Sequence, residues 1–332
     1  MNAIELHQEI LVWDAHRDLH YEMPLQERFL QRQMYNVDLH LPLLVKGGIQ
    51  VQTYAFCYAA SLGLPSTIQA VADIEKTLQL IEEYSSQVCH VKTVAEAMQA
   101  KAEGKLAAFF SFEGGEPIVT DLWLLRFFHR VGFRAMGLTW NFRNELADGG
   151  YEGRDGYGLS SFGKQVVQEM NRLGMVVDLA HLTPQSMVDV MTISEQPVIH
   201  SHGGIRGVNP SHPRTLDDSM LERIARNGGV FCVTSVPNAL VTDRPATLND
   251  FLDAIDYAVK VMGDEYVGLG ADFDVYQSHL EHPIGSWTQG LEEADRWMNV
   301  TAGLLERGYS PLAIARIMGE NLKRVYLAVI GK

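Results

Sequence analysis

The sequence predicts an α/β fold in which a single (β/α)₈ TIM barrel is followed by an extra C-terminal helix. Short runs rich in β-branched and aromatic residues alternate eight times with longer amphipathic stretches along the 332 residues. No linker rich in Ser, Gly or Pro and no internal repeat divides the sequence, so we expect residues 1–332 to form one domain. A doubly wound open sheet is the alternative, and the positions of the reactive side chains distinguish the two architectures.

Strands and helices are expected in alternation from the first residues to the last. Strands are predicted at residues 10–14, 49–56, 106–112, 133–139, 175–180, 197–201, 229–236 and 266–271. Helices are predicted at residues 66–84, 94–102, 121–131, 161–173, 184–194, 217–227, 249–262, 292–306 and 311–329. Two helix starts carry a local signal, because Thr183-Pro184 and Ser310-Pro311 each place a capping residue before a proline in the first turn.

Composition and charge exclude several classes of protein. The 27 Lys and Arg against 41 Asp and Glu give a net charge of −14, which argues against a nucleic-acid or anionic-membrane partner. No apolar run approaches the roughly 18 residues of a membrane helix, and no secretory signal is readable at the first residues. The three cysteines, Cys57, Cys89 and Cys232, are widely spaced, which is typical of a reducing compartment. We therefore expect a cytoplasmic protein with a small-molecule partner, and a homodimer is compatible with the sequence.

Histidines and carboxylates occur at the ends of five predicted strands. These residues are His16 and Asp18, Glu113, His181, His202 and Asp272. Barrel enzymes carry their reactive groups at the carboxyl ends of several strands, so this distribution favours a barrel over an open sheet. His16 and Asp18 are two residues apart, and in an extended chain both side chains point the same way and can bind one ion.

The donor types indicate a metal centre. Imidazoles combined with carboxylates suit Zn²⁺ or a related transition ion better than Ca²⁺ or Mg²⁺. A single ion needs only three or four such groups, so five of them favour two ions that share a carboxylate and a water nucleophile. Glu113 is the candidate for the shared carboxylate, since its strand lies between those that carry the other ligands. A Lys on the fourth predicted strand cannot supply the shared ligand instead, because no Lys occurs between Lys105 and Lys164.

The chain resembles the membrane (renal) dipeptidase family, zinc metallopeptidases of the amidohydrolase-like TIM-barrel group. The resemblance runs in order from about residue 10 to residue 275, and its longest segment lies between Gly158 and His181. The matching motifs are His16-Arg17-Asp18, Phe112-Glu113-Gly114-Gly115, Gly158–Lys164, Met170–His181, Pro197–His202, His212-Pro213-Arg214 and Asp272-Phe273-Asp274.

The resemblance implies a dipeptidase with two zinc ions per chain. His16 and Asp18 would hold one zinc, His181 and His202 would hold the other, and Glu113 would bridge them. A hydroxide between the ions would attack the peptide carbonyl, with Asp272 as general acid and base. Arg214 would receive the terminal carboxylate of the dipeptide. Family members commonly accept a D-residue at the C-terminal position.

Departures from the pattern of the family include one residue and one spacing. Trp140 stands where the family has a His that steadies the oxyanion, and Asn141 follows it; we expect both to contact the substrate. Removal of an oxyanion donor typically costs on the order of 10²–10³ in rate. The spacing from His202 to Arg214 is one residue longer than usual, which makes Arg206 a competing carboxylate binder.

These departures leave two alternatives to a dipeptidase. One is an amidohydrolase that acts on a small N-acyl or cyclic amide. The other is a binding protein that holds metal without catalysis, although the retained Asp272 argues against it.

Overall fold

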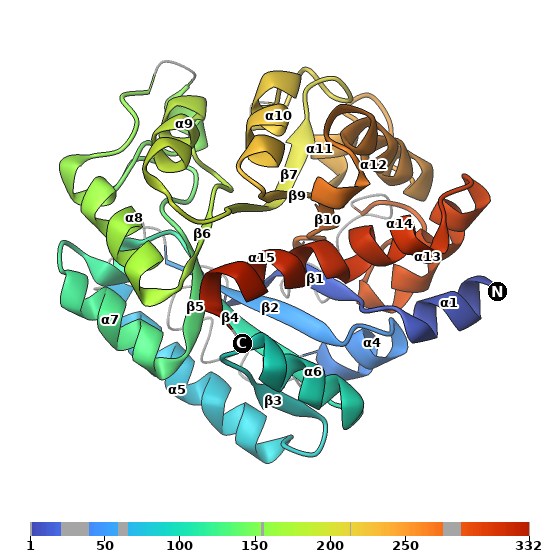
Figure 1. The fold of residues 1–332 in the computed structure, drawn as a ribbon, viewed down its shortest axis with the longest axis horizontal. Helices are drawn as coiled ribbons and strands as arrows, with labels where there is room; N and C mark the ends of the chain where they lie inside the picture. Colours follow the sequence, from blue (N-terminus) through green and yellow to red (C-terminus); the bar gives the residue numbers. More distant parts are fainter. Residues whose placement is uncertain are drawn as a thin grey trace.

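The computed structural model describes residues 2–20, 40–58, 66–153, 156–212, 214–274 and 287–331. Within these ranges, eight parallel strand positions form a nearly closed barrel, which confirms the predicted fold (Figure 1). The strands are β1 (Trp13–His20), β2 (Val51–Cys57), β4 (Leu106–Glu113), β5 (Phe133–Gly137), β6 (Val176–Asp178), β7 (Ile199–Ile205), β9 (Val230–Val233), and an eighth in two pieces, β10 (Val267–Leu269) and β11 (Phe273–Asp274). The barrel closes where β11 pairs with β1, with Arg17 opposite Phe273.

Two short strands were not predicted from the sequence. β3 (Val88–His90) pairs with the first residues of β4, and β8 (Thr215–Leu216) pairs with the last residues of β7. Each is too short to produce a readable alternation of apolar and polar residues. β8 matters for the site, because its pairing with β7 brings Arg214 back beside the strand that carries His202.

The helices surround the barrel (Figure 1). They are α1 (Ala3–Glu9), α4 (Leu41–Lys46), α5 (Ser66–Glu83), α6 (Val94–Ala102), α7 (Leu122–Val131), α8 (Ser161–Leu173), α9 (Pro184–Ile193), α10 (Asp218–Arg226), α11 (Pro237–Leu240), α12 (Leu248–Met262), α13 (Trp297–Glu306), α14 (Pro311–Ala315) and α15 (Asn321–Ile330). Both predicted caps are confirmed, since Thr183 accepts from the amide of Ser186 and Ser310 from the amide of Ala313. The short helices α1, α4 and α11 were missed because none completes two turns of periodicity.

The first strand extends further than its prediction. It was expected over residues 10–14 but runs from Trp13 to His20, so His16 and Asp18 lie within the strand and not after it. The pairing with β2 shifts register between Asp14 and Arg17, which is the mark of a bulge or a local irregularity. A run of charged residues is atypical of a strand, and here the barrel interior overrides local propensity.

The C-terminal helix is interrupted, in contrast to the continuous helix predicted over 311–329. A turn of π-helix over residues 316–320 separates α14 from α15. Within that turn, a Cβ added to Gly319 would lie 2.6 Å from the carbonyl oxygen of Leu11, so glycine permits this close approach. The predicted helix 292–306 likewise begins later, with a 3₁₀ turn over Ala294–Arg296 before α13.

The helix α15 lies across one end of the barrel (Figure 1). Its Tyr326 packs 4.7 Å from the ring of Trp13, and Trp13 stacks 5.2 Å from Phe109 of β4. Leu322 and Val325 belong to the same buried cluster, which fills the amino-terminal half of the barrel. Burial of these side chains closes that end, and the carboxyl ends of the strands are left to form the site.

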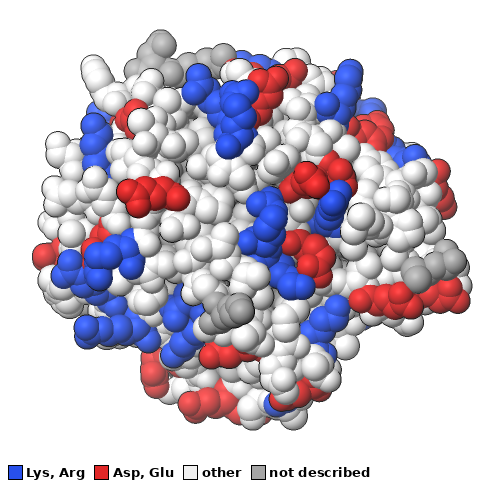
Figure 2. Space-filling view, in the orientation of Figure 1, with Lys and Arg blue, Asp and Glu red and all other residues white. Residues whose placement is uncertain are grey.

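Acidic and basic side chains are interspersed on the face that carries α15 (Figure 2). Among the helices in the described ranges, none combines the length and the apolar character that a membrane crossing requires.

Candidate metal centre

One carboxylate oxygen of Glu113, at the end of β4, lies among three imidazoles. Its Oε1 is 2.6 Å from Nε2 of His181, 3.5 Å from Nε2 of His202 and 3.6 Å from Nε2 of His16. Asp18 completes the group, with Oδ1 3.5 Å from Nε2 of His16. All five side chains are buried. The residues expected to bind metal therefore converge on one small volume at the carboxyl ends of four strands.

Asp272 lies beside this cluster. Its Oδ1 is 3.7 Å from Nε2 of His16, and its Oδ2 is 4.0 Å from Nε2 of His202. The backbone at Asp272 and at His181 has a positive φ, of 61° and 65°. A left-handed conformation costs a non-glycine residue about 1–3 kcal/mol and persists only where the surrounding structure imposes it. At both positions it accompanies a side chain that faces the centre.

The charges in the cluster fit a bound cation. Burial alone would lower the pKa of His16, but the adjacent carboxylates of Glu113 and Asp18 outweigh it and raise the pKa to about 10. Burial, together with the charge of Glu113, raises the pKa of Asp18 to about 7. Nε2 of His16 and Oδ1 of Asp18 are buried without a hydrogen-bond partner. Unpaired buried donors and acceptors are costly, and a metal ion would satisfy both.

Two overlapping sets of ligand atoms have the spacing of a metal site. His16, Glu113 and His202 form one set, and His16, Asp18 and Asp272 form the other, with the atoms of each set within 4.8 Å of one another. Burial lowers the pKa of both His181 and His202 well below the usual value, so both rings are neutral. Neutral imidazole is the form that binds metal. The residues therefore fit zinc or a related ion.

The two neutral rings are held through their second nitrogens. Nδ1 of His181 lies 2.9 Å from Oδ1 of Asn141, and Nδ1 of His202 lies 2.9 Å from Oγ of Ser201. An oxygen acceptor on Nδ1 leaves the lone pair of Nε2 free, and the two Nε2 atoms point to the same place, 2.8 Å apart. Ser201 was not identified from the sequence, although its place next to His202 was a signal that could have found it.

Two buried aspartates hold the backbone around the centre. Oδ1 of Asp178 accepts from the amides of Ala180 and Ser201, each at 2.9 Å. Oδ1 of Asp14 accepts from the amides of Ala271, at 3.0 Å, and His16, at 3.3 Å. Sequence reasoning missed Asp14, which ties the start of the strand with His16 to the segment with Asp272.

The expected substrate contacts lie on one side of the cluster. Nη1 of Arg214 is 2.5 Å from Nδ1 and 3.0 Å from Nε2 of His181. The ring of Trp140 lies 6.2 Å from that of His181 and 6.3 Å from that of Phe142. Asn141 is buried and its carboxamide oxygen faces His181, so in this structure it contacts a candidate ligand.

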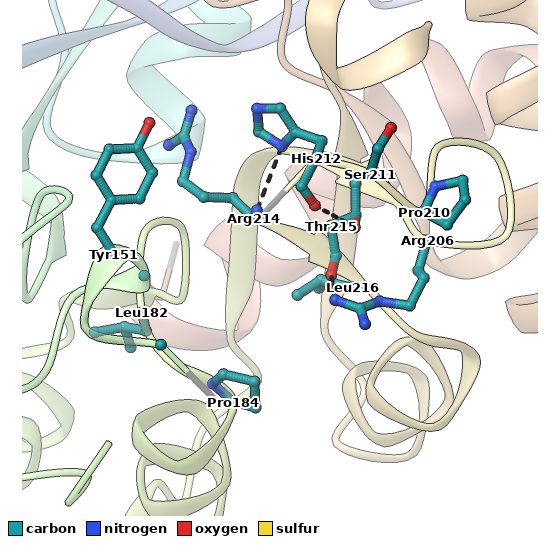
Figure 3. A pocket seen from close by; sticks show the side chains of 12 residues that line it. Tyr151, Leu182, Pro184, Arg206, Pro210, Ser211, His212, Arg214, Thr215 and Leu216 are labelled. Carbon is teal, nitrogen blue, oxygen red and sulfur yellow. Dashed lines mark hydrogen bonds between the residues drawn. The ribbon is translucent and has the colours of Figure 1, made fainter. Parts of the chain in front are cut away.

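Two hollows that share part of their lining adjoin these residues. A small one, of about 20 Å³, is lined by His181, His202 and Asp272. A larger one, of about 340 Å³, extends from Arg214 and Tyr151 to Arg206 (Figure 3). Leu182, His212 and Arg214 line both hollows. The two hollows are therefore adjacent, with Arg214 between them.

A (β/α)₈ barrel with buried imidazoles and carboxylates at the carboxyl ends of its strands defines the class of metal-dependent hydrolases. The family model described as "Membrane dipeptidase (Peptidase family M19)" matches residues 1–330, and the chain belongs to this family of metal-dependent dipeptidases.

The relatives agree with this assignment. "Dipeptidase tcpJ" of Claviceps purpurea (strain 20.1) is 30% identical over 329 residues, and the match covers 94% of this chain and 75% of the relative. An amidohydrolase from Pseudomonas aeruginosa is 26% identical, with a TM-score of 0.87 over 100% of both chains. A metallopeptidase from Rhodobacter sphaeroides, solved with a phosphinate mimic of the dipeptide L-Ala-D-Ala, has the same fold, with 22% identity and a TM-score of 0.82 over 96% of this chain and 99% of the other.

Proposed function

We propose that this chain hydrolyses the amide bond of dipeptides at a centre of two zinc ions. The observation that carries the proposal is the position of Glu113, whose single oxygen Oε1 lies within 3.6 Å of the Nε2 atoms of three histidines. A carboxylate between two groups of ligands is the arrangement that two metal ions share. His16 and Asp18 would hold one ion, and His181 and His202 would hold the other.

When bound, the two ions would polarise the peptide carbonyl and lower the pKa of the water that attacks it. Asp272 would take a proton from that water and return it to the amine that leaves, so no proton is lost or gained in the cycle. Burial raises the pKa of Asp272, while the positive charge of His16 opposes that shift. A carboxyl with a raised pKa is better suited to carry a proton at intermediate stages than an ordinary aspartate.

Arg214 would bind the terminal carboxylate of the dipeptide. Its Nη1 reaches His181 at the edge of the centre, whereas Arg206 lies at the other end of the larger hollow (Figure 3). A guanidinium at this place limits the substrate to one residue after the scissile bond, because a longer peptide has no carboxylate there. The proposal includes tolerance of a D-residue at this position, which the resemblance to the family suggests.

The experiment that tests the proposed function is a hydrolysis screen of the zinc-loaded protein. The substrates are dipeptides with L- and D-residues at the C-terminal position, together with N-acetylated amino acids. Release of both amino acids from dipeptides supports the proposal. If N-acetylated amino acids are hydrolysed and dipeptides are not, the protein is an amidohydrolase that acts on small amides. Two observations support this alternative: Trp140 in place of the family's His, and the similarity to an amidohydrolase.

Three broader proposals accompany the activity. The chain forms a single domain, because the barrel strands and the helix that closes them are drawn from nearly its whole length. We propose a cytoplasmic location, which the free cysteines Cys57, Cys89 and Cys232 support. A homodimer is supported by exposed apolar side chains, such as Trp123 and Phe127 of α7.

A further inference from the structure

The hollow next to Arg214 has a second cationic side chain that the proposed reaction does not use. The hollow measures about 340 Å³, which is at the lower end of the range for small-ligand pockets, and it shares Leu182, His212 and Arg214 with the small hollow at the centre. Its far side carries Arg206, directly after β7 (Figure 3). If Arg214 binds the terminal carboxylate, the side chain of the same residue has this space to occupy.

Arg206 is not engaged by any carboxylate among the described residues. Its Nη2 makes one long bond, of 3.4 Å, to the carbonyl oxygen of Thr215, and its Nε is buried without a partner. In contrast, most arginines in the described part of the chain form ion pairs, such as Arg126 with Glu169 and Arg307 with Asp256. A guanidinium with unused donors is a ready binding group for an anion.

The lining of the hollow complements a negative charge. The described residues around it include two arginines and no Asp or Glu. The remaining polar groups are Tyr151, Ser211, His212 and Thr215, which can hydrogen-bond an anion, while Leu182, Pro184, Pro210 and Leu216 provide apolar walls. In a protein of net charge −14, a cavity of this composition attracts acidic groups against the general charge of the surface.

We propose that this hollow is a subsite for the side chain of the C-terminal residue and that Arg206 selects an acidic one. The preferred substrates are then dipeptides that end in glutamate or aspartate, with the main-chain carboxylate on Arg214 and the side-chain carboxylate on Arg206. The inference rests on the proposed function for the position of the scissile bond. Arg206 acts here as a specificity residue and takes no part in proton transfer.

The test compares an acidic substrate with its neutral isostere. The zinc-loaded wild-type protein, Arg206→Gln and the control Arg226→Gln are assayed with alanyl-glutamate and alanyl-glutamine, each with both stereoisomers of the C-terminal residue. Arg226 lies on α10 with a side chain 64% exposed and does not line the hollow, so its substitution removes the same charge without changing the lining. We expect wild type and Arg226→Gln to favour glutamate by about 10- to 100-fold in kcat/KM. In Arg206→Gln, the ratio should fall to near one while the rate with alanyl-glutamine is retained.

A binding measurement separates this inference from the proposed function. Free glutamate and glutamine, the amino acids that hydrolysis would release, are titrated into the same three proteins by calorimetry. Binding of glutamate that is tighter than that of glutamine in wild type and lost in Arg206→Gln supports the subsite even if no dipeptide is cleaved. Equal kcat/KM for the two dipeptides in wild type, or an unchanged preference in Arg206→Gln, overturns the subsite while leaving a dipeptidase. If no dipeptide is cleaved and glutamate binds no more tightly than glutamine, both the proposed function and the subsite are wrong.

Discussion

The carboxamide oxygen of Asn141 lies 2.9 Å from Nδ1 of His181, a ring whose Nε2 faces Glu113. A carboxamide oxygen accepts from a protonated Nδ1, and a histidine ring in that tautomer offers Nε2 to a metal. We predict that Asn141→Ala lowers zinc affinity by about 10- to 100-fold, the usual loss when a partner of a ligand histidine is removed. Chelator competition measures this. An unchanged zinc affinity would contradict this prediction and leave Asn141 as a substrate contact only.

Asp178 should be needed for its acceptor oxygen more than for its charge. In Asp178→Ala, the buried amides of Ala180 and Ser201 lose their acceptor, and we expect a loss of about 1–3 kcal/mol per amide. Asp178→Asn keeps an acceptor and should recover most of the stability. Chemical unfolding of the three proteins measures the difference. If both variants are equally destabilised, the charge of Asp178 is the important property.

Asp272→Asn should separate metal binding from turnover. The amide keeps the shape of the side chain but cannot accept and return a proton, so we expect kcat to fall by about 10²–10⁴-fold. Zinc content should be unchanged, since five other residues supply ligands. Steady-state kinetics and elemental analysis of the same sample provide the two readings. A variant with the kcat of wild type would remove Asp272 from the mechanism.

Acid should destabilise the protein partly through His7, which lies outside the metal centre. His7 is buried, with Nε2 2.8 Å from the carbonyl oxygen of Gly47 and Nδ1 2.6 Å from Oγ1 of Thr301. Burial lowers its pKa below the ordinary value of 6.5. His7 therefore takes up a proton near pH 6.5 in the unfolded chain but only at lower pH in the folded chain. As the pH drops below 6.5, the free energy of unfolding falls.

The measurement is the free energy of unfolding at pH 8 and at pH 5.5 for wild type and His7→Gln. Because glutamine does not titrate, the variant should lose less stability between the two pH values than wild type does. An equal loss in both proteins would show that His7 contributes nothing to the pH dependence.

The helix α15 should stabilise the barrel without affecting its chemistry. Tyr326 is 1% exposed and packs on Trp13, whereas Leu327, the next residue, is 40% exposed. We expect Tyr326→Ala to lower the free energy of unfolding by about 3–5 kcal/mol and Leu327→Ala to change it by less than about 0.5 kcal/mol. The kcat of the folded Tyr326→Ala protein should equal that of wild type. Similar losses in the two variants would contradict the packing described for α15.

The alternation of strands and helices was readable from the sequence because several barrel strands, such as β2, β4 and β9, are short, buried and largely apolar runs. The prediction was poorest at β1, where His16, Arg17 and Asp18 look like a loop. Those residues are buried in a strand because other strands supply their partners, and such contacts cannot be read from local sequence. The break at Gly319 has the same origin, since it depends on Leu11 at the other end of the chain.

The candidate site was predictable where its residue types are chemically distinctive. Histidine and carboxylate at strand ends signal metal chemistry, and the structure brings His16, Asp18, Glu113, His181 and His202 together. The residues that hold these ligands were less predictable. The hydroxyl of Ser201 and the carboxylate of Asp14 are defined by distances across the fold, not by spacing along the chain.

The two-metal centre is tested most directly by the zinc stoichiometry of the wild-type protein. The protein is stripped with a chelator, titrated with zinc, desalted and subjected to elemental analysis. A centre in which Glu113 lies between two groups of ligands predicts saturation at two zinc ions per chain. Saturation at one ion, or none retained, would contradict the two-metal centre.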